Sequence, residues 1–565
     1  MRKLGIYVTA LTIFIFIIFL SYLFNTSNLN INPQILIVDE NNNEVMYITN
    51  NHKSSTTNLE DLSESFINRL LFIEDKDFYK HNGFNIKRII KSAYNNITKN
   101  TNQGASTITQ QYVKNTYLSN EQTLIRKIRE LILSIRIENM KSKDEILSEY
   151  LSVVYFGNNV YGINNASLYY FDKKPKDLTV HEQIALIALL KSPSLYSNDY
   201  DKWTNRIKIY STVLYNNSLI TYDEYQQAQS TIKTNINENY IPSSKLYFVD
   251  KVLEEFNKEG FIAKFGSKVI IKTFYNNKTE IIDTNLNVNY SLISINKNGY
   301  ITTLIGDKDY KKSEYNIAIN GTRDIGSTIK PLLYYEAIKC GFKNKTFLSS
   351  PYNINYKDTN VTISNSSGNY YNEYIDMITA LASSDNIYAV KMHMLLGMNT
   401  LVNTLKQYQI ESKPIISLAL GSVGMSLLDL TKIYTQFFLN GLYVNPICIY
   451  KITVNDKSYI YEPSKIQILN SDICKEIKDM MGYVFSNKIK YATCKWVNPY
   501  LKEKCYGKSG LTDYDSYMIG FTEDNLVSVW CGHTDNSLLT NKEHKRLPKE
   551  LFIKAISLVS PSGTN

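Results

Sequence analysis

Cysteine is scarce in this chain of 565 residues, which has six, all from Cys340 onward. Their spacing matches no zinc-binding framework. Cys494 and Cys505 could pair in an oxidising compartment, and free thiols fit the sequence equally well. A large excess of one charge is also lacking, because 62 basic and 53 acidic residues leave a net charge of +9. That small excess does not indicate a nucleic-acid partner; it fits a mixed solvated surface or work beside anionic lipid.

Two nucleotide- and metal-binding motifs are incomplete. Gly507-Lys508-Ser509 looks like the end of a phosphate-binding loop, but Lys502 occupies the position of the first glycine. His181-Glu182 begins a zinc-protease motif, yet no second histidine follows at the required spacing. The sequence therefore predicts neither a nucleotide-binding loop nor a resident metal.

One long apolar run stands at the N-terminus, at residues 4–24 after Arg2 and Lys3. As a helix it would span about 31 Å at ~1.5 Å per residue, which matches a hydrocarbon core of about 30 Å. The run is longer than that of a cleavable signal and lacks a small-x-small exit. We expect an uncleaved anchor, with residues 1–3 cytoplasmic and the rest outside the cell, a single-pass type II topology.

The remaining chain divides by composition. Hydrophobic residues make up 44% of the whole chain, enough for packed cores, and its length suggests about three units. We predict a polar stalk at 25–57 around one strand-like run, a helical domain at 58–235, a linker at 236–267 and a mixed domain at 268–560. The mixed domain shows strand-like runs at both ends, with helical stretches between them.

Three segments of the helical domain carry candidate chemistry. Glu74 ends an apolar run, where a carboxylate tends to have a raised pKa and can act as a base, although helix caps and ion pairs occupy such places more often. Residues 104–111 bring hydroxyls and amides suited to a sugar or phosphate. Arg126 and Glu130 share a helical face, set off from an isoleucine stripe at positions 125, 128, 132 and 135; the alternative is a surface ion pair.

Taken together, these segments resemble the peptidoglycan glycosyltransferase domain of the bifunctional, class A penicillin-binding proteins. That family shows E-D-x-x-F-x-x-H-x-G, G-x-S-T-I-T-Q-Q and R-K-x-x-E in this order, and the similarity covers about 58–197. The resemblance implies a mainly α-helical, lysozyme-like domain that polymerises undecaprenyl-pyrophosphate-linked precursor into glycan strands with inversion. Lys76, Asn85 and Ser152 depart from the usual Arg, Asp and Asn.

The resemblance also implies a role for each residue. Glu74 would deprotonate the acceptor hydroxyl, and Glu130 would position donor groups or a divalent ion, Mg²⁺ or Mn²⁺. Lys114, Arg126 and Lys127 would stabilise the leaving pyrophosphate, and Ser106 and Gln110 would bind substrate.

The mixed domain contains the pattern Ser-x-x-Lys, which puts a lysine one helical turn from a serine. It occurs at Ser230, Ser294 and Ser327. Ser327 has the favourable context, because Gly326 precedes it and an apolar helix follows Lys330. Ser230 lies in a polar run and Ser294 in a strand-like alternation.

Two further motifs follow, Ser384-Asp385-Asn386 and Lys508-Ser509-Gly510. Such a set recurs in β-lactamases and penicillin-binding proteins, and residues 268–533 resemble the transpeptidase domain of the latter, an antiparallel sheet flanked by helices. The resemblance implies that Ser327 forms an acyl-enzyme on a D-Ala-D-Ala stem peptide with Lys330 as base. Ser384 and Asn386 would relay a proton and hold the peptide, and Lys508, Ser509 and Gly510 would bind its carboxylate end.

Leu511 departs from the family, where threonine is frequent. The backbone N–H groups of Ser327 and Leu511 would still form the oxyanion hole. One hydroxyl for the substrate carboxylate is lost, at a typical cost of about 1.5–3 kcal/mol for a charged partner, and Thr512 is the candidate to replace it.

The leading hypothesis is a bifunctional peptidoglycan synthase that β-lactams inhibit. Its expected partners are the cytoplasmic membrane, nascent glycan strands and proteins of a cell-wall synthesis complex, with no cofactor for transpeptidation. Two alternatives are a glycosyltransferase with a degenerate scaffold domain and an anchored β-lactam sensor. The sensor does not explain the segments from Glu74 to Glu130, and the scaffold would need a missing catalytic residue.

Overall fold

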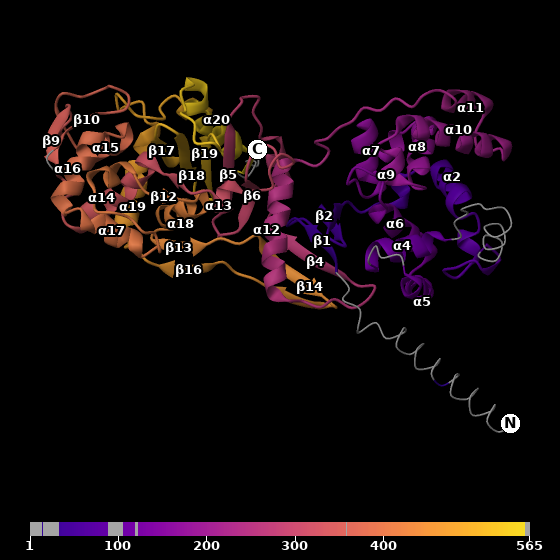
Figure 1. Ribbon diagram of the computed structural model, residues 1–565. Helices are drawn as coiled ribbons and strands as arrows, with labels where there is room; N and C mark the ends of the chain where they lie inside the picture. Colours follow the sequence, from indigo (N-terminus) through magenta and orange to yellow (C-terminus); the bar gives the residue numbers. More distant parts are fainter. Residues whose placement is uncertain (1–13, 15–32, 89–105, 119–122, 357–358, 560–565) are drawn as a thin grey trace. The chain divides into compact units, whose positions relative to one another are not determined.

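The computed structural model describes Phe14 and residues 33–88, 106–118, 123–356 and 359–559 (Figure 1). Two compact units are present. The first runs to Ile241 and takes in Gly260–Ile271 and Ile452–Tyr459, and the second contains Pro242–Glu259, Lys272–Lys451 and the chain from Ile460. The predicted tail and membrane anchor, residues 1–24, lie outside the described residues except for Phe14. Within the described ranges, no helix is both long and apolar enough to cross a membrane.

The first unit is mainly helical, as predicted. Its helices are α2 (Glu64–Glu74), α4 (Ile108–Tyr117), α5 (Leu124–Met140), α6 (Lys143–Val153), α7 (Ile163–Phe171), α8 (Val180–Leu189), α9 (Pro193–Tyr196), α10 (Tyr200–Asn216) and α11 (Tyr222–Ala228). Capping boxes at Thr107, Ser142, Thr179 and Thr221 define four of the N-termini. Helix α8 is buried from Gln183 to its end, and α2, α7, α10 and α11 pack around it. It is therefore the core helix of this unit.

A six-stranded sheet has most of its residues in the first unit. Its order is β15-β14-β4-β1-β2-β3. The strands are β1 (Gln34–Val38), β2 (Glu44–Thr49), β3 (His52–Ser54), β4 (Lys268–Thr273), β14 (Ile449–Val454) and β15 (Lys457–Ile460). The segment predicted as a polar stalk thus contains the strands β1, β2 and β3. It is not a solvated stalk, because residues of β1 and β2 such as Ile37 and Tyr47 are fully buried.

The second unit is built on an antiparallel sheet of order β17-β18-β19-β5-β6. Its strands are β5 (Asn289–Asn296), β6 (Ile301–Ile305), β17 (Tyr506–Leu511), β18 (Asp515–Phe521) and β19 (Asn525–Gly532). Helix α20 (Lys542–Val559) packs on the face that contains Gly520, and α18 (Leu427–Phe438) packs on the face that contains Phe521 (Figure 1). This arrangement agrees with the expected α/β domain.

The other elements of the second unit surround this sheet. Its remaining helices are α12 (Ser243–Glu259), α13 (Ile317–Asn320), α14 (Lys330–Lys339), α15 (Met377–Ser383), α16 (Asn386–Leu396), α17 (Asn399–Lys406) and α19 (Ser471–Gly482). Short strand pairs are β7 (Arg323–Asp324) with β12 (Gly424–Met425), β8 (Phe347–Leu348) with β11 (Tyr374–Ile375), β9 (Tyr352–Tyr356) with β10 (Thr359–Ile363), and β13 (Leu442–Asn445) with β16 (Ser464–Gln467).

Two expectations need correction. The segment predicted as a linker contains α12, whose apolar residues Phe248, Val249 and Val252 are fully buried. The isoleucine stripe is only in part the buried face of α5, since Ile132 is 4% exposed but Ile125 is 52% exposed, and Glu130, Leu133 and Ile137 are buried beside it. All six cysteines are free thiols.

Candidate active sites

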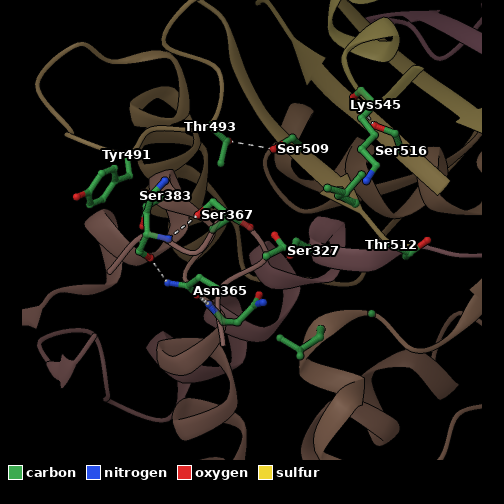
Figure 2. A pocket seen from close by; sticks show the side chains of 18 of the residues that line it. Ser327, Asn365, Ser367, Ser383, Tyr491, Thr493, Ser509, Thr512, Ser516 and Lys545 are labelled. Carbon is green, nitrogen blue, oxygen red and sulfur yellow. Dashed lines mark hydrogen bonds between the residues drawn. The ribbon is translucent and has the colours of Figure 1, made fainter. Parts of the chain in front are cut away.

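The turn that carries Ser327 lines a cleft of about 750 Å³ in the second unit. Ser327 lies in the short helix η6 (Gly326–Ile329), and α14 follows directly from Lys330. Ser384 and Asn386 line the same cleft, and so does Ser509 (Figure 2). The three motifs lie far apart in the sequence and therefore meet at one place only in the folded chain.

The Lys330 ammonium is buried behind Ser327 and points at the second motif. Its Nζ lies 2.7 Å from Ser384 O, 3.3 Å from Ser384 Oγ, 3.3 Å from Asp385 O and 2.7 Å from Asn386 Oδ1. Among the described residues no hydrogen bond joins it to Ser327 Oγ, although Ser327 lies in η6, directly before the helix that Lys330 begins. These contacts hold the Lys330 amine at the start of α14. In structures without substrate, hydrogen bonds between catalytic groups are commonly long.

Lys508 reaches the same hydroxyl from β17. Its Nζ donates to Ser384 Oγ at 2.8 Å and to Ser509 O at 2.8 Å. The Ser384 hydroxyl thus lies between two buried amines. This geometry suits a proton relay, because the hydroxyl can accept from one amine and donate to another group.

Both lysines have a depressed pKa. Burial and then the charge of Lys508 hold the pKa of Lys330 well below its usual range. Burial lowers the pKa of Lys508 to about 7. A neutral amine beside a serine is the form that can take its proton, so burial favours the form of Lys330 that can act as a base.

Ser384 and Asn386 are fixed by residues outside the sequence motifs. Ser384 has a left-handed backbone, with φ of 59° and ψ of 40°. Asn365 accepts from Asn386 N at 2.7 Å and donates to Asp385 Oδ2 at 2.9 Å, and Ser349 donates to the same carboxylate oxygen at 2.7 Å. Asn365 lies in a polar loop, and its only sequence signal was the Gly/Asn-rich composition there.

The edge of β17 faces the Ser327 turn. A side chain on Gly510 would meet Thr328 Cγ2 at 2.7 Å, and one on Gly326 would meet Leu511 N at 3.1 Å. Thr512 N donates to Asp515 O, so the neighbouring pair Leu511 and Ser516 is a non-hydrogen-bonded one. The Leu511 N–H therefore points away from β18 toward the free edge, where the proposed oxyanion hole requires it.

The predicted role of Thr512 fits less well. Its hydroxyl accepts from Tyr514 N at 3.1 Å and from Asp515 N at 2.9 Å, and lies 3.3 Å from Asp515 Oδ2. These bonds fix the turn between β17 and β18. The hydroxyl is thus occupied within the protein, even though Thr512 lines the cleft.

The structure places the other two Ser-x-x-Lys serines away from the cleft. Ser230 Oγ donates to Gln227 O at 2.7 Å on an exposed helix end. Ser294 is fully buried inside β5. Neither serine lines the cleft.

In the first unit, Glu74 is the last residue of α2 and is half-buried. Its Oε2 accepts from Gln111 Nε2 at 3.1 Å, and Gln111 Oε1 accepts from Tyr150 OH at 3.1 Å. Burial raises the pKa of Glu74, partly offset by the Gln111 hydrogen bond and the charges of Lys191 and Arg88. A carboxylate with a raised pKa is a stronger base once ionised.

Gln110 does not take the position expected for a substrate contact. It is 2% exposed, and its Oε1 accepts from Thr107 N at 3.0 Å as part of the capping box of α4. The neighbouring Gln111 contacts the candidate base instead. Residues 104 and 105 of the same motif lie outside the described residues.

Glu130 forms a compact charge cluster. It is 1% exposed, accepts from Arg126 Nη1 at 3.0 Å, and is bonded by Lys127 Nζ, which also donates to Ser106 Oγ at 3.0 Å. The Arg126–Glu130 ion pair thus has a buried carboxylate, unlike an ordinary surface ion pair. Lys114 is exposed at the last turn of α4 and has no ion pair in the described part of the chain.

The described residues do not form a metal site around Glu130. Lys127 and Arg126 each hold one of its two oxygens, and the described ranges contain no cluster of three metal-ligating side chains. We therefore derive no step through a divalent ion. Helix α4 and the residue before its N-cap contact both Glu74 and the Glu130 cluster. Gln111 in this helix donates to Glu74, and Ser106 accepts from Lys127. Residues 89–105 lie outside the described residues.

Comparisons with known proteins agree with this two-site organisation. The transglycosylase family model matches residues 41–216, and the penicillin-binding-protein transpeptidase model matches residues 292–552. The chain is 32% identical to penicillin-binding protein 2D of Bacillus subtilis over 554 residues, which cover 90% of this chain and 79% of that protein. It is 28% identical to penicillin-binding protein 1A of Clostridium botulinum over 577 residues, with coverage of 89% and 68%.

The fold is similar to a solved structure as well. The crystal structure of penicillin-binding protein 1A from Haemophilus influenzae aligns with a TM-score of 0.56 at 15% identity, over 95% of this chain and 94% of that one. At this identity the alignment shows a shared fold.

Proposed function

Because the chain belongs to the class A, bifunctional penicillin-binding proteins, we propose that Ser327 and Glu74 carry its two reactions. The chain is a bifunctional peptidoglycan synthase, with peptidoglycan glycosyltransferase and transpeptidase activity. The assignment of individual residues goes beyond family membership, and the contacts around each site support it.

For transpeptidation, the neutral Lys330 amine takes the proton of Ser327, whose Oγ attacks the carbonyl of the penultimate D-alanine. The oxyanion lies between the N–H groups of Ser327 and Leu511. The terminal D-alanine leaves with a proton passed through Ser384, and the amine of a neighbouring stem peptide then attacks the acyl-enzyme. The observation that carries this assignment is the Ser384 hydroxyl held between Lys330 and Lys508, at 3.3 Å and 2.8 Å.

For glycan polymerisation, ionised Glu74 takes the proton of the acceptor hydroxyl, which displaces the lipid pyrophosphate in one inverting step. Gln111 positions the carboxylate through its 3.1 Å hydrogen bond. The exposed Lys114 and the cationic Arg126–Lys127–Glu130 cluster stabilise the leaving pyrophosphate. The cluster keeps a net charge of +1, since two cations share one carboxylate.

We further propose that residues 4–24 anchor the chain in the cytoplasmic membrane with the N-terminus inside. Both sites then lie where lipid-linked precursor and nascent glycan strands are found. The precursor is the substrate and β-lactams bind at Ser327. Proteins of a cell-wall synthesis complex are proposed partners.

Two substitutions test the assignment on the full-length protein. Ser327→Ala should abolish covalent labelling by a fluorescent penicillin and leave glycan polymerisation intact. Glu74→Gln should reduce polymerisation by about 10²–10⁴-fold, the typical contribution of a general base, and leave labelling intact. Labelling of Ser327→Ala, or polymerisation by Glu74→Gln at the unmodified rate, would refute the corresponding assignment.

A further inference from the structure

A second hydroxyl stands beside Ser509 in the Ser327 cleft. Thr493 Oγ1 and Ser509 Oγ are 3.0 Å apart, and both residues line the cleft (Figure 2). Thr493 comes from the segment between the short helices η8 (Tyr483–Phe485) and η9 (Asn498–Tyr500), outside every sequence motif. Two hydroxyls at this separation can both donate to one carboxylate.

Backbone contacts fix the position of Thr493. Its N–H donates to Ala382 O at 3.0 Å, in the helix that ends beside Ser384. Its carbonyl oxygen accepts from Lys549 Nζ at 2.9 Å. Lys549 belongs to α20 and also lines the cleft, so one lysine both supports Thr493 and brings a positive charge to it.

The lining of the cleft favours an anion. Four lysines line it, at positions 490, 495, 545 and 549, against the two carboxylates of Asp324 and Asp513. On β17, Leu511 offers no hydroxyl and the Thr512 hydroxyl is bonded within its turn. Of Ser509, Leu511 and Thr512, only Ser509 thus has a hydroxyl that can turn to a ligand, by giving up its bond to the neighbouring Thr493.

We propose that Thr493 and Lys549 complete the carboxylate site of the transpeptidase. The terminal carboxylate of the stem peptide, or the carboxylate of a penicillin, accepts hydrogen bonds from the Ser509 and Thr493 hydroxyls, and Lys549 supplies the charge. Ligand binding exchanges one neutral bond between hydroxyls for two charge-assisted ones. The inference rests on the proposed role of Ser327, and it explains how Leu511 is tolerated.

The test compares acylation of the full-length protein by benzylpenicillin and by its methyl ester, which lacks the carboxylate charge. Thr493→Val should lower the ratio of acid to ester rate constants by roughly tenfold to a hundredfold, the usual range for a hydrogen bond to a charged group. The ester rate itself should stay within about twofold of the unmodified protein. Lys549→Met should lower the ratio in the same direction.

Two further variants sharpen the result. Lys554 lies on the same helix but does not line the cleft, and its Nζ donates to Asp283 O at 3.2 Å. Lys554→Met should therefore leave the ratio of acid to ester rate constants unchanged. Leu511→Thr in the Thr493→Val background should restore the ratio, because it returns a hydroxyl on the other side of Ser509.

Equal loss of acid and ester rates in Thr493→Val, or no loss of either, would overturn the inference, because Thr493 would then only support its segment. The proposed function fails differently, through penicillin labelling of Ser327→Ala.

Discussion

Two buried amines share one hydroxyl at the transpeptidase site, and this sharing determines its proton chemistry. Lys330 and Lys508 are both fully buried, and no carboxylate is hydrogen-bonded to either within the described ranges. Burial without a counter-ion disfavours the charged form of each. The second amine adds repulsion to the first, so the two titrations are coupled.

We expect Lys508→Met to shift the acid limb of the acylation pH profile upward. The charge of Lys508 is, after burial, a cause of the depressed Lys330 pKa, so its removal raises that pKa. Because the base acts as the neutral amine, acylation then requires a higher pH. Lys508 is charged mainly below its own pKa of about 7, so it lowers the pKa of Lys330 mainly in that pH range. Penicillin acylation rates measured across pH, with Lys554→Met as control, check the shift, and an unmoved limb would contradict it.

Gln111 offers a second prediction for a single residue. Its hydrogen bonds to Glu74 and Tyr150 hold the candidate base in one orientation. We expect Gln111→Leu to lower glycan polymerisation about tenfold or more, as loss of a bond to a charged group costs about 1.5–3 kcal/mol. Gln111→Glu should be worse at high pH, where two carboxylates repel each other. Unchanged polymerisation by Gln111→Leu would show that Glu74 needs no such support.

The positions of site residues were predictable where a motif fixed them and not otherwise. Ser327, Lys330, Ser384 and Lys508 meet as the motifs predict. Gln110 and Gln111 are adjacent, and only the rotation of α4 decides which one faces Glu74. Asn365 and Thr493 act from irregular segments whose positions depend on tertiary contacts, so no local pattern could indicate them.

Three short elements meet around the nucleophile, and glycine permits their approach. Gly421, just after the short helix η7 (Ile416–Leu420), has φ of +85°, and a Cβ there would come within 2.0 Å of Gly326 O. Gly326 itself abuts β17. The turn that holds Ser327 is thus wedged between η7 and β17.

We expect Gly421→Ala to lower penicillin acylation more than tenfold and to reduce thermal stability. The substitution combines the backbone cost of a left-handed alanine, about 1–2 kcal/mol, with an overpacking cost of about 1–3 kcal/mol. Gly341→Ala is the matched control, because Gly341 also has φ of +85° but nothing within 4 Å of its Cβ. Gly341→Ala should lose only the stability that corresponds to the left-handed backbone of alanine, and it should keep the acylation rate of the unmodified protein. Equal acylation by both variants would show that the contact with Gly326 is not required.

Element types followed from periodicity in most places, and the exceptions have physical reasons. Strands β17 to β19 are buried throughout apart from Leu511, and β18 and β19 were expected as strands. Strand β15 has four exposed residues and thus no hydrophobic alternation to detect. In α5 the isoleucine stripe correctly indicated a helix but only part of its buried face, because Glu130, held by two cations, is buried there together with Ile132.

At the scale of the whole molecule, the first unit is discontinuous in sequence. Strands β4 and β14 complete a sheet with β1 to β3, although they lie more than 200 residues later in the chain. The motifs predicted two catalytic regions, and the family models agree. Composition could not predict this sheet, because non-local strand pairing leaves no local signal in one sequence.

A buried ion pair ties this late segment to the helical part of the first unit. Lys268 Nζ, on β4, lies 3.1 Å from Glu149 Oε1, and Lys141 Nζ lies 2.6 Å from each Glu149 oxygen. Tyr112 donates to the same carboxylate. Burial alone would raise the pKa of Glu149, but the charges of Lys268 and Lys141 outweigh it and lower the pKa.

We therefore expect the stability of the first unit to depend on this carboxylate and on pH. A depressed carboxyl pKa contributes stability above the ordinary value near 4.5, and this contribution is lost as pH falls through the folded-state pKa. Lys268→Met should lower the free energy of unfolding by about 1–3 kcal/mol at pH 7. It should also raise the pH at which acid destabilises this unit, because Glu149 then has one neighbouring cation fewer and a higher folded-state pKa. Calorimetric unfolding at pH 7 and pH 4 measures both effects. In a Glu149→Gln background the same Lys268→Met change should cost little, since the charge it balanced is gone. An equal cost in both backgrounds would mean that Lys268 stabilises the sheet by packing alone, and that the ion pair does not join β4 to the helices.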